Sequence, residues 1–287
     1  MNDDRYRGWV RPGPVPPGAV PVEEGESLDY LCGHFRIFQY ERGHRYSTDD
    51  VLTAWYGTQW APRVDRAADL GSGIGSVAMI AAWRLPGAHF CTVEAQEMSL
   101  RLARKSVAWN GLEDRFRLYL GDLRDPSVLE NEEPFDLVTG SPPYFPEGTA
   151  TPAVHGQAVP ARIEVRGSVH DYAAAAARIL RAGGVFAFVF PTLQRDRALD
   201  ALSAHGLVLL RSREVVFKEG EPSLISLFAA SRAEDLPPSF TRPSPGKPWV
   251  EPPLIIRDRA GRVHPEYATV RLGFGFPPGD VASGEAE

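Results

Sequence analysis

Short apolar runs alternate along this chain with stretches in which apolar residues recur every three or four positions. The first pattern indicates buried strands, and the second indicates amphipathic helices. Strands are predicted over 67–70, 90–93, 116–120, 135–139, 185–190, 207–217 and 223–231. Helices are predicted between them over 76–83, 97–110, 168–180 and 192–205. Such alternation is typical of a doubly wound α/β fold with a mostly parallel sheet, in which ligands bind at the carboxyl ends of the strands.

Both ends of the chain depart from this alternation. Residues 1–26 are rich in proline, glycine and charge, which predicts a flexible or extended arm. After the arm, 35–40 alternates like a strand, and the run Ser47-Thr48-Asp49-Asp50 predicts the capped start of a helix that ends near residue 60. Further on, 235–248 predicts a proline-rich connection and 254–263 predicts a small hairpin.

Glycine or a polar residue follows directly after each of the first four predicted strands. The first strand runs into Asp69 and the turn Gly71-Ser72-Gly73-Ile74-Gly75, and the next three run into Glu94, Gly121-Asp122 and Ser141. The carboxyl ends of parallel strands meet at one edge, so we expect these residues to converge. Glycines between a strand and a helix let a ligand approach the backbone closely, and an acid at the end of the second strand can accept both hydroxyls of a ribose.

The turn Ser141-Pro142-Pro143-Tyr144 follows the fourth strand. Its prolines stiffen the backbone and leave their carbonyls free as acceptors. A flat group with an exocyclic amine suits this turn, because Ser141 and a proline carbonyl can accept the amine hydrogens while the ring stacks on Tyr144. The turn therefore favours methyl transfer to an amine over hydride transfer. Residues 146–166 show little periodicity and predict a long loop over the site.

Composition and charge limit the other classes of function. No lysine follows the glycines, so the turn is not a nucleotide-hydrolysing P-loop. Cys32 and Cys91 fit no metal or redox spacing and are expected to be free thiols in a reducing cytoplasm. The chain shows no secretory signal, and no apolar run is long enough for a bilayer. We expect a cytoplasmic protein without a metal, and no protein partner is evident.

Together these motifs resemble class I S-adenosylmethionine-dependent amino-methyltransferases. The resemblance rests on Asp69-Leu70-Gly71-Ser72-Gly73-Ile74-Gly75, Val93-Glu94, Gly121-Asp122 and Ser141-Pro142-Pro143-Tyr144-Phe145. More narrowly, three further segments are similar to the bacterial family that methylates adenine N6 in valine tRNA, next to the anticodon. They are Gln39–Asp49, Ala161–Glu164 and Glu251–Glu266. The resemblance covers about residues 27–267 and implies one class I methyltransferase domain with a Rossmann-like, seven-stranded sheet, an N-terminal arm (1–26) and a C-terminal tail (268–287).

The resemblance also implies a role for each motif residue. The methionine part of S-adenosylmethionine would be lined by Asp69, Gly71, Ser72, Gly73 and Gly75. Glu94 would bind the ribose, and Asp122 would bind the adenine amino group of the cofactor. The target base, turned out of its stack, would be held by Ser141, Pro142, Pro143 and Tyr144, with Ser141 also next to the cofactor. No strong general base would be required, because the enzyme mainly positions the amine for in-line transfer.

The net charge of −6 argues against wholesale non-specific nucleic-acid binding, so tRNA would have to be held by a local set of basic residues. Four arginines in segments flanking the expected pocket are candidates: Arg42, Arg45, Arg162 and Arg166. Pairing with a nearby acid, such as Glu41 or Glu164, is an equally good explanation for any one of them.

Two positions depart from the family pattern and leave alternatives open. Ser141 stands where the family usually has asparagine, and serine before Pro-Pro-aromatic also resembles cytosine-N4 DNA methyltransferases. His44 replaces a usual tyrosine. The alternatives are another amino-methyltransferase, acting on an rRNA or DNA base or on protein glutamine, or a catalytically weak cofactor-binding protein. No segment has room for a DNA target-recognition region, and glutamine methyltransferases usually begin with a helical domain, where this chain has an arm.

Overall fold

A central sheet of eight strands organises the computed structural model, which describes residues 5–6, 9–60, 63–145, 164–238 and 249–281. Strand β11 runs antiparallel to both of its neighbours, and all other neighbouring strands of the sheet are parallel to each other. In spatial order the strands are β12 (Trp249–Arg257), β10 (Leu207–Lys218), β11 (Ile225–Arg232), β9 (Leu180–Pro191), β8 (Phe135–Gly140), β5 (Arg66–Leu70), β6 (His89–Glu94) and β7 (Phe116–Leu120). This confirms the predicted doubly wound, mostly parallel α/β fold.

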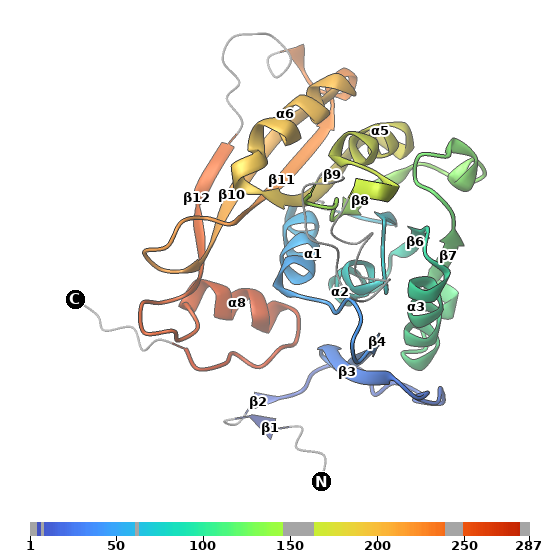
Figure 1. Cartoon of the computed structure of the whole chain (residues 1–287), viewed down its shortest axis with the longest axis vertical. Coiled ribbons are helices and arrows are strands. Elements are labelled where there is room, and N and C mark those ends of the chain that lie inside the picture. The colour runs from blue at the N-terminus through green and yellow to red at the C-terminus, as the bar shows by residue number, and fades with distance from the viewer. Residues whose placement is uncertain (1–4, 7–8, 61–62, 146–163, 239–248, 282–287) are drawn as a thin grey trace.

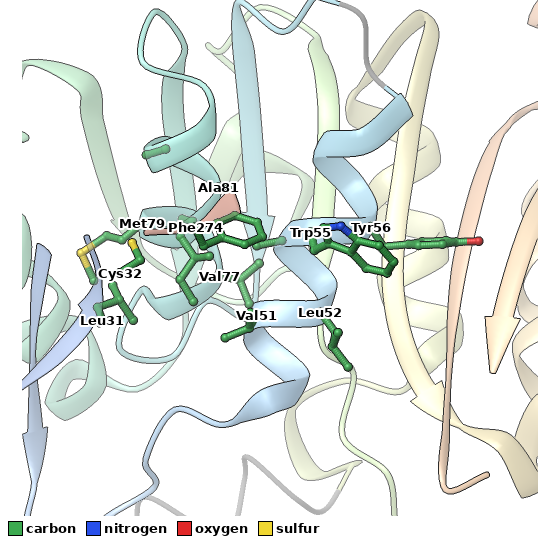
Figure 2. Close-up of a cluster of buried hydrophobic side chains, with 14 of the residues drawn as sticks. Leu31, Cys32, Val51, Leu52, Trp55, Tyr56, Val77, Met79, Ala81 and Phe274 are labelled. Atoms are coloured by element: carbon green, nitrogen blue, oxygen red, sulfur yellow. The ribbon is translucent and has the colours of Figure 1, made fainter. Parts of the chain in front are cut away.

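Helices cover both faces of the sheet, which explains why its central strands, such as β8 and β9, are buried and mostly apolar. The first face carries α1 (Thr48–Trp60), α2 (Ser76–Arg84), α3 (Glu97–Trp109) and α8 (Pro265–Gly273), and the second carries α5 (Val169–Ile179) and α6 (Arg195–Ala204). Strand β9 alternates between the two cores: Ala187 and Val189 pack on the first face, and Phe186 and Phe188 pack on the second. The α1 side of the first core is shown in Figure 2, where Val51 of α1 lies beside Val77 of α2.

Each strand and helix predicted in the alternating region is present, with ends that shift by a few residues. Thr192–Gln194 forms a 3-10 turn ahead of α6, and β9 starts at Leu180, five residues before the predicted strand. Ahead of β4 (Phe35–Tyr40), the sequence analysis missed β3 (Glu26–Cys32), which pairs antiparallel with it. No helix among the described residues is long and apolar enough to cross a membrane.

The C-terminal segment forms an eighth strand, where the sequence predicted a small hairpin in a seven-stranded protein. Strand β12 pairs parallel with β10, and the register shifts where Pro252 and Pro253 pass. Prolines are tolerated there because an edge strand needs hydrogen bonds on one side only. Of the predicted hairpin, an isolated antiparallel bridge between Arg257 and Val263 is present.

The proline-rich segment predicted as an arm contacts the domain over its described residues. The Arg11 guanidinium donates to the Gly33 carbonyl at 2.7 Å, and the Gly18 N–H donates to the carbonyl of Trp109 at 3.2 Å. The two short strands at its start, β1 (Arg5–Tyr6) and β2 (Trp9–Val10), pair with each other. These contacts lead the segment along α3 and into β3.

A buried charge cluster joins β12 to the rest of the sheet. Arg211 of β10 is almost fully buried, and its guanidinium donates to the Tyr56 carbonyl at 2.7 Å and to Glu251 of β12 at 3.4 Å. The Tyr56 hydroxyl donates to the same Glu251 carboxylate at 2.7 Å. Burial lowers the pKa of Arg211, and these acceptors offset the cost of taking its cation out of water.

We therefore expect Glu251→Ala to lower the free energy of unfolding by on the order of 3 kcal/mol, because it leaves a buried cation without its carboxylate. Urea unfolding measures the change. The matched control is Glu219→Ala, which removes the exposed partner of Arg259 and should cost less than about 1 kcal/mol. Equal effects of the two variants would show that the buried cluster does not hold β12.

Candidate active site

A cavity of about 610 Å³ lies at the carboxyl ends of β5, β6 and β8, where the strand order reverses. This is the position at which doubly wound sheets bind ligands. Nine of the residues singled out from the sequence line it: Asp69, Gly71, Ser72, Gly73, Glu94, Ser141, Pro142, Pro143 and Tyr144. Sequence motifs that lie far apart along the chain therefore line the same cavity.

The glycine turn forms the floor of the cavity in a conformation that suits glycine alone. Gly71 and Gly73 have φ of 60° and 55°, in the left-handed region. A Cβ at Gly71 would lie 1.9 Å from the Tyr172 hydroxyl, whereas a Cβ at Gly73 would meet nothing within 4 Å. Gly73 therefore leaves open space for a ligand. Gly75 does not line the cavity; it precedes α2 and packs near Ala103.

Glu94 ties the glycine turn to the next helix. One carboxylate oxygen accepts the Gly73 N–H at 2.8 Å, and the other accepts the Gln96 N–H at 2.7 Å. Burial raises the pKa of Glu94, and the backbone donors oppose that shift. A carboxylate can accept about four hydrogen bonds, so Glu94 keeps acceptor capacity towards the cavity.

Three buried polar atoms of the lining residues have no hydrogen-bond partner in the described part of the chain. They are Asp69 Oδ2, Ser72 Oγ and Ser141 Oγ. The other Asp69 oxygen accepts from Thr139 Oγ1 at 2.7 Å. Burial raises the pKa of Asp69 to about 7. An unpaired buried polar atom costs roughly 1–3 kcal/mol, so the cavity suits a ligand that brings hydrogen-bond donors and, near Asp69, a positive charge.

Tyr144 is held against the start of α1. Its hydroxyl donates to Asp49 Oδ2 at 2.6 Å, and its ring packs edge-on against Phe190 with centroids 6.2 Å apart. Burial raises the pKa of Asp49, an effect that the Tyr144 hydrogen bond opposes. Pro142 and Pro143 are buried behind it.

Among the lining residues that sequence reasoning missed are Asp49, Asp50 and Tyr172. Asp49 and Asp50 were read only as the start of a helix. Asp50 does accept the Ser47 N–H at 2.7 Å, as the predicted capping box requires, and it also accepts from Ser76 Oγ of α2 at 2.8 Å. Two adjacent acids at the predicted start of a helix were the available signal. For Tyr172, an aromatic residue inside a helix, the sequence held none.

Of the remaining predicted residues, some line the cavity and others do not. Asp122 lines a neighbouring hollow, and its carboxylate pairs with Arg124 at 2.5 Å. Arg45 and Arg166 line the cavity, where Arg45 pairs with Asp29 at 2.8 Å and Arg166 donates to the Ala95 carbonyl at 2.7 Å. Arg42 is exposed and does not line the cavity, and Arg162 lies outside the described residues.

Among the described residues, no group of three His, Cys, Asp or Glu side chains could hold a metal ion. Cys32 and Cys91 are both buried free thiols.

The sequence of this chain is similar to those of known methyltransferases. Residues 58–205 match the family described as methyltransferase small domain. A tRNA1(Val) (adenine(37)-N6)-methyltransferase of Porphyromonas gingivalis is 31% identical over 248 residues, which cover 83% of this chain and 90% of that protein. A release factor glutamine methyltransferase of Gloeobacter violaceus is 31% identical over 183 residues, which cover 58% of this chain and 62% of that protein.

Among solved structures, a predicted O-methyltransferase of Agrobacterium tumefaciens superposes with a TM-score of 0.58. The match covers 82% of this chain and 100% of that one, at 19% identity. At this level of identity the likeness concerns the fold.

Asp69 gives a prediction about stability and pH. Its folded-state pKa of about 7 exceeds the usual value of 3.8, so ionisation of Asp69 destabilises the fold increasingly from about pH 4 to pH 7. We expect Asp69→Asn, which cannot ionise, to raise the free energy of unfolding at pH 8 by on the order of 3 kcal/mol and to have little effect near pH 4.5. Urea unfolding at both pH values measures this, with the exposed Asp196→Asn as control. An equal effect at both pH values would contradict the assignment.

Proposed function

As a member of the methyltransferase small domain family, and within it of the bacterial tRNA1(Val) adenine-N6 methyltransferase family, the chain is a methyltransferase; we propose that it methylates an adenine N6 in tRNA, using S-adenosylmethionine. The observation that carries this proposal is the meeting of two features in one cavity. Unpaired acceptors at the glycine turn lie on one side, and the Ser-Pro-Pro-Tyr turn lies on the other.

The residues present fit S-adenosylmethionine, which when bound supplies an electrophilic methyl group. Asp69 Oδ2, buried and without a partner in the described structure, would bind the positively charged amino group of the methionine part. Ser72 would add a hydroxyl, and the backbone at Gly73 has room for a ligand to approach. Glu94 would accept the ribose hydroxyls while it continues to hold the glycine turn. For the adenine end, Gly121 and Leu123 line the cavity, and Asp122 would contribute only by leaving Arg124.

The Ser-Pro-Pro-Tyr turn would hold the base that receives the methyl group. Ser141 Oγ and a proline carbonyl would accept the two hydrogens of the amine, which orients the nitrogen lone pair, and Tyr144 would stack on the ring. Positioning of this kind is the main contribution that the chain makes to the reaction, because an amine can attack without a strong general base. The base would have to leave its stack to reach the cavity.

Transfer RNA is the substrate class that the Porphyromonas gingivalis relative supports, because its match extends over nine-tenths of that protein. Arg45 and Arg166, which line the cavity, would face the RNA backbone near the target nucleotide. Protein glutamine is the second candidate, since the Gloeobacter violaceus relative is a release factor glutamine methyltransferase. A side-chain amide presents much the same hydrogens as a base amine.

Cofactor binding is tested with Gly73→Leu. The variant places a bulky side chain in the open space at Gly73, so S-adenosylhomocysteine should bind about ten- to a hundredfold more weakly by calorimetry. Gly220→Leu is the matched control, because Gly220 also has a positive φ (89°) and free space for a Cβ, but lies in a distant turn. If both variants bind like the wild type, the glycine turn is not part of the cofactor site.

The substrate is tested by transfer of labelled methyl groups from S-adenosylmethionine to an unmodified valine-tRNA transcript, to rRNA, to DNA and to release-factor protein. We expect label in the tRNA, on adenine N6. Ser141→Ala should lower the single-turnover rate about ten- to a hundredfold, because one amine hydrogen loses its acceptor. Label in the release factor alone would support the glutamine alternative, and no transfer to any fraction would refute the proposed activity.

A further inference from the structure

The turn that faces the cavity is fixed by side chains from helices outside the sequence motifs. Tyr144 is bound at its hydroxyl by Asp49 of α1, 95 positions earlier in the chain. It is bound at its carbonyl by Gln194, whose amide nitrogen donates to that oxygen at 2.7 Å. Asp49 lies on α1, which packs in one core, and Gln194 directly precedes α6, which packs in the other. Tyr144 packs against both cores.

The hydroxyl contact fixes the direction in which the Tyr144 side chain points. The hydroxyl oxygen lies on the axis about which the ring turns, so the bond to Asp49 holds the far end of the ring in place, and packing restrains its plane. The bond to Asp49 is short, at 2.6 Å, as bonds to carboxylates are. Phe190 packs against the Tyr144 ring at an interplanar angle of 89°. The hydroxyl is thus engaged within the protein, and what Tyr144 can offer a flat ligand in the cavity is its ring face.

The carbonyl contact belongs to a closed ring of hydrogen bonds. Gln194 accepts from Arg197 at 2.5 Å, and Arg197 also donates to both oxygens of Glu164, at 2.7 and 3.0 Å. The Glu164 N–H donates to the carbonyl of Phe145 at 3.0 Å. Two successive carbonyls of the turn, those of Tyr144 and Phe145, are therefore bound by groups that Arg197 links together.

We propose that Asp49 and Gln194 are positioning residues that fix Tyr144 as a stacking surface for the target base. The proposal rests on the function proposed above, and it assigns to the start of α1 and the turn before α6 a part in substrate recognition. Neither residue needs to touch the base. Each acts through Tyr144, Asp49 by orienting the ring and Gln194 by holding the main chain that carries it.

A double-mutant cycle separates this role from any direct one. Asp49→Ala removes the acceptor, and Tyr144→Phe removes the donor but keeps the ring. Each should lower the single-turnover rate of methyl transfer to the tRNA transcript about ten- to a hundredfold. If Asp49 acts through the Tyr144 hydroxyl, the double variant should be no slower than Tyr144→Phe alone. Asp49→Asn, which keeps an oxygen for the hydroxyl, should recover most of the rate.

Gln194 is tested with an isosteric change. Gln194→Glu removes the N–H that donates to the Tyr144 carbonyl but keeps an oxygen for Arg197. We expect it to lower the rate about tenfold or more. Asp196→Ala, at an exposed position of α6 two residues further on, is the control and should match the wild type. Affinity for S-adenosylhomocysteine should stay unchanged in all of these variants, because the residues act on the substrate side.

Two results would overturn the proposal: rate losses for Asp49→Ala and Tyr144→Phe that multiply in the double variant, or a loss of S-adenosylhomocysteine affinity in Asp49→Ala. Wild-type protein that transfers no methyl group to RNA would instead refute the proposed function. In that case the same cycle, measured as midpoints of urea unfolding, still tests the contact between Asp49 and the Tyr144 hydroxyl. If the contact holds Tyr144, the midpoint shifts of the two single variants are not additive in the double variant; additive shifts exclude it.

Discussion

The close approach of two strand ends to one tyrosine is the constraint around which the site is built. Tyr172 of α5 reaches across the sheet edge, where a Cβ at Gly71 would lie 1.9 Å from its hydroxyl and a Cβ at Gly140 would lie 2.7 Å from its ring. Gly71 follows β5 and Gly140 ends β8, the two strands between which the strand order reverses. Because neither strand end carries a side chain there, the helix can pack directly on the backbone, and the glycine turn and the Ser-Pro-Pro-Tyr turn are brought to the two sides of one cavity.

The buried acidic side chains of this cavity destabilise the protein when no ligand is bound. Asp69 and Glu94 are buried, and burial raises the pKa of both carboxyls because it disfavours their charge. Glu94 recovers part of this cost through two backbone N–H donors, but Asp69 leaves one oxygen unpaired within the described structure. A ligand with a cationic amine would relieve that cost on binding. An acidic residue kept at a site where it destabilises the fold is a stronger sign of function than one that is fully paired.

The parts of the fold and site that the sequence predicts depend on local pattern. Strand and helix periodicity gives each element of the parallel sheet, and the glycine turn and the strand-end acids follow because such a sheet gathers its carboxyl ends at one edge. Contacts between distant segments leave no such mark: the Tyr144–Asp49 bond spans 95 positions, and Tyr172 reads as an ordinary buried aromatic. Strand β12 was missed for a different reason, since two prolines argue against a strand unless it is known to lie at an edge.

The segments that distinguished the narrower family hold both ends of α1, and the first of them also lines the cavity through Arg45 and Asp49. Buried Gln39 accepts the Tyr46 N–H at 2.8 Å and donates to Asp29 at 3.0 Å, which fixes the approach to α1. At the far end of that helix, Glu251 receives the hydroxyl of Tyr56 and pairs with Arg211. Both ends of α1 are thus fastened by residues outside the generic motifs. Since the first turn of this helix carries Asp49 to Tyr144, a change in either fastening would reach the stacking surface without altering any motif residue.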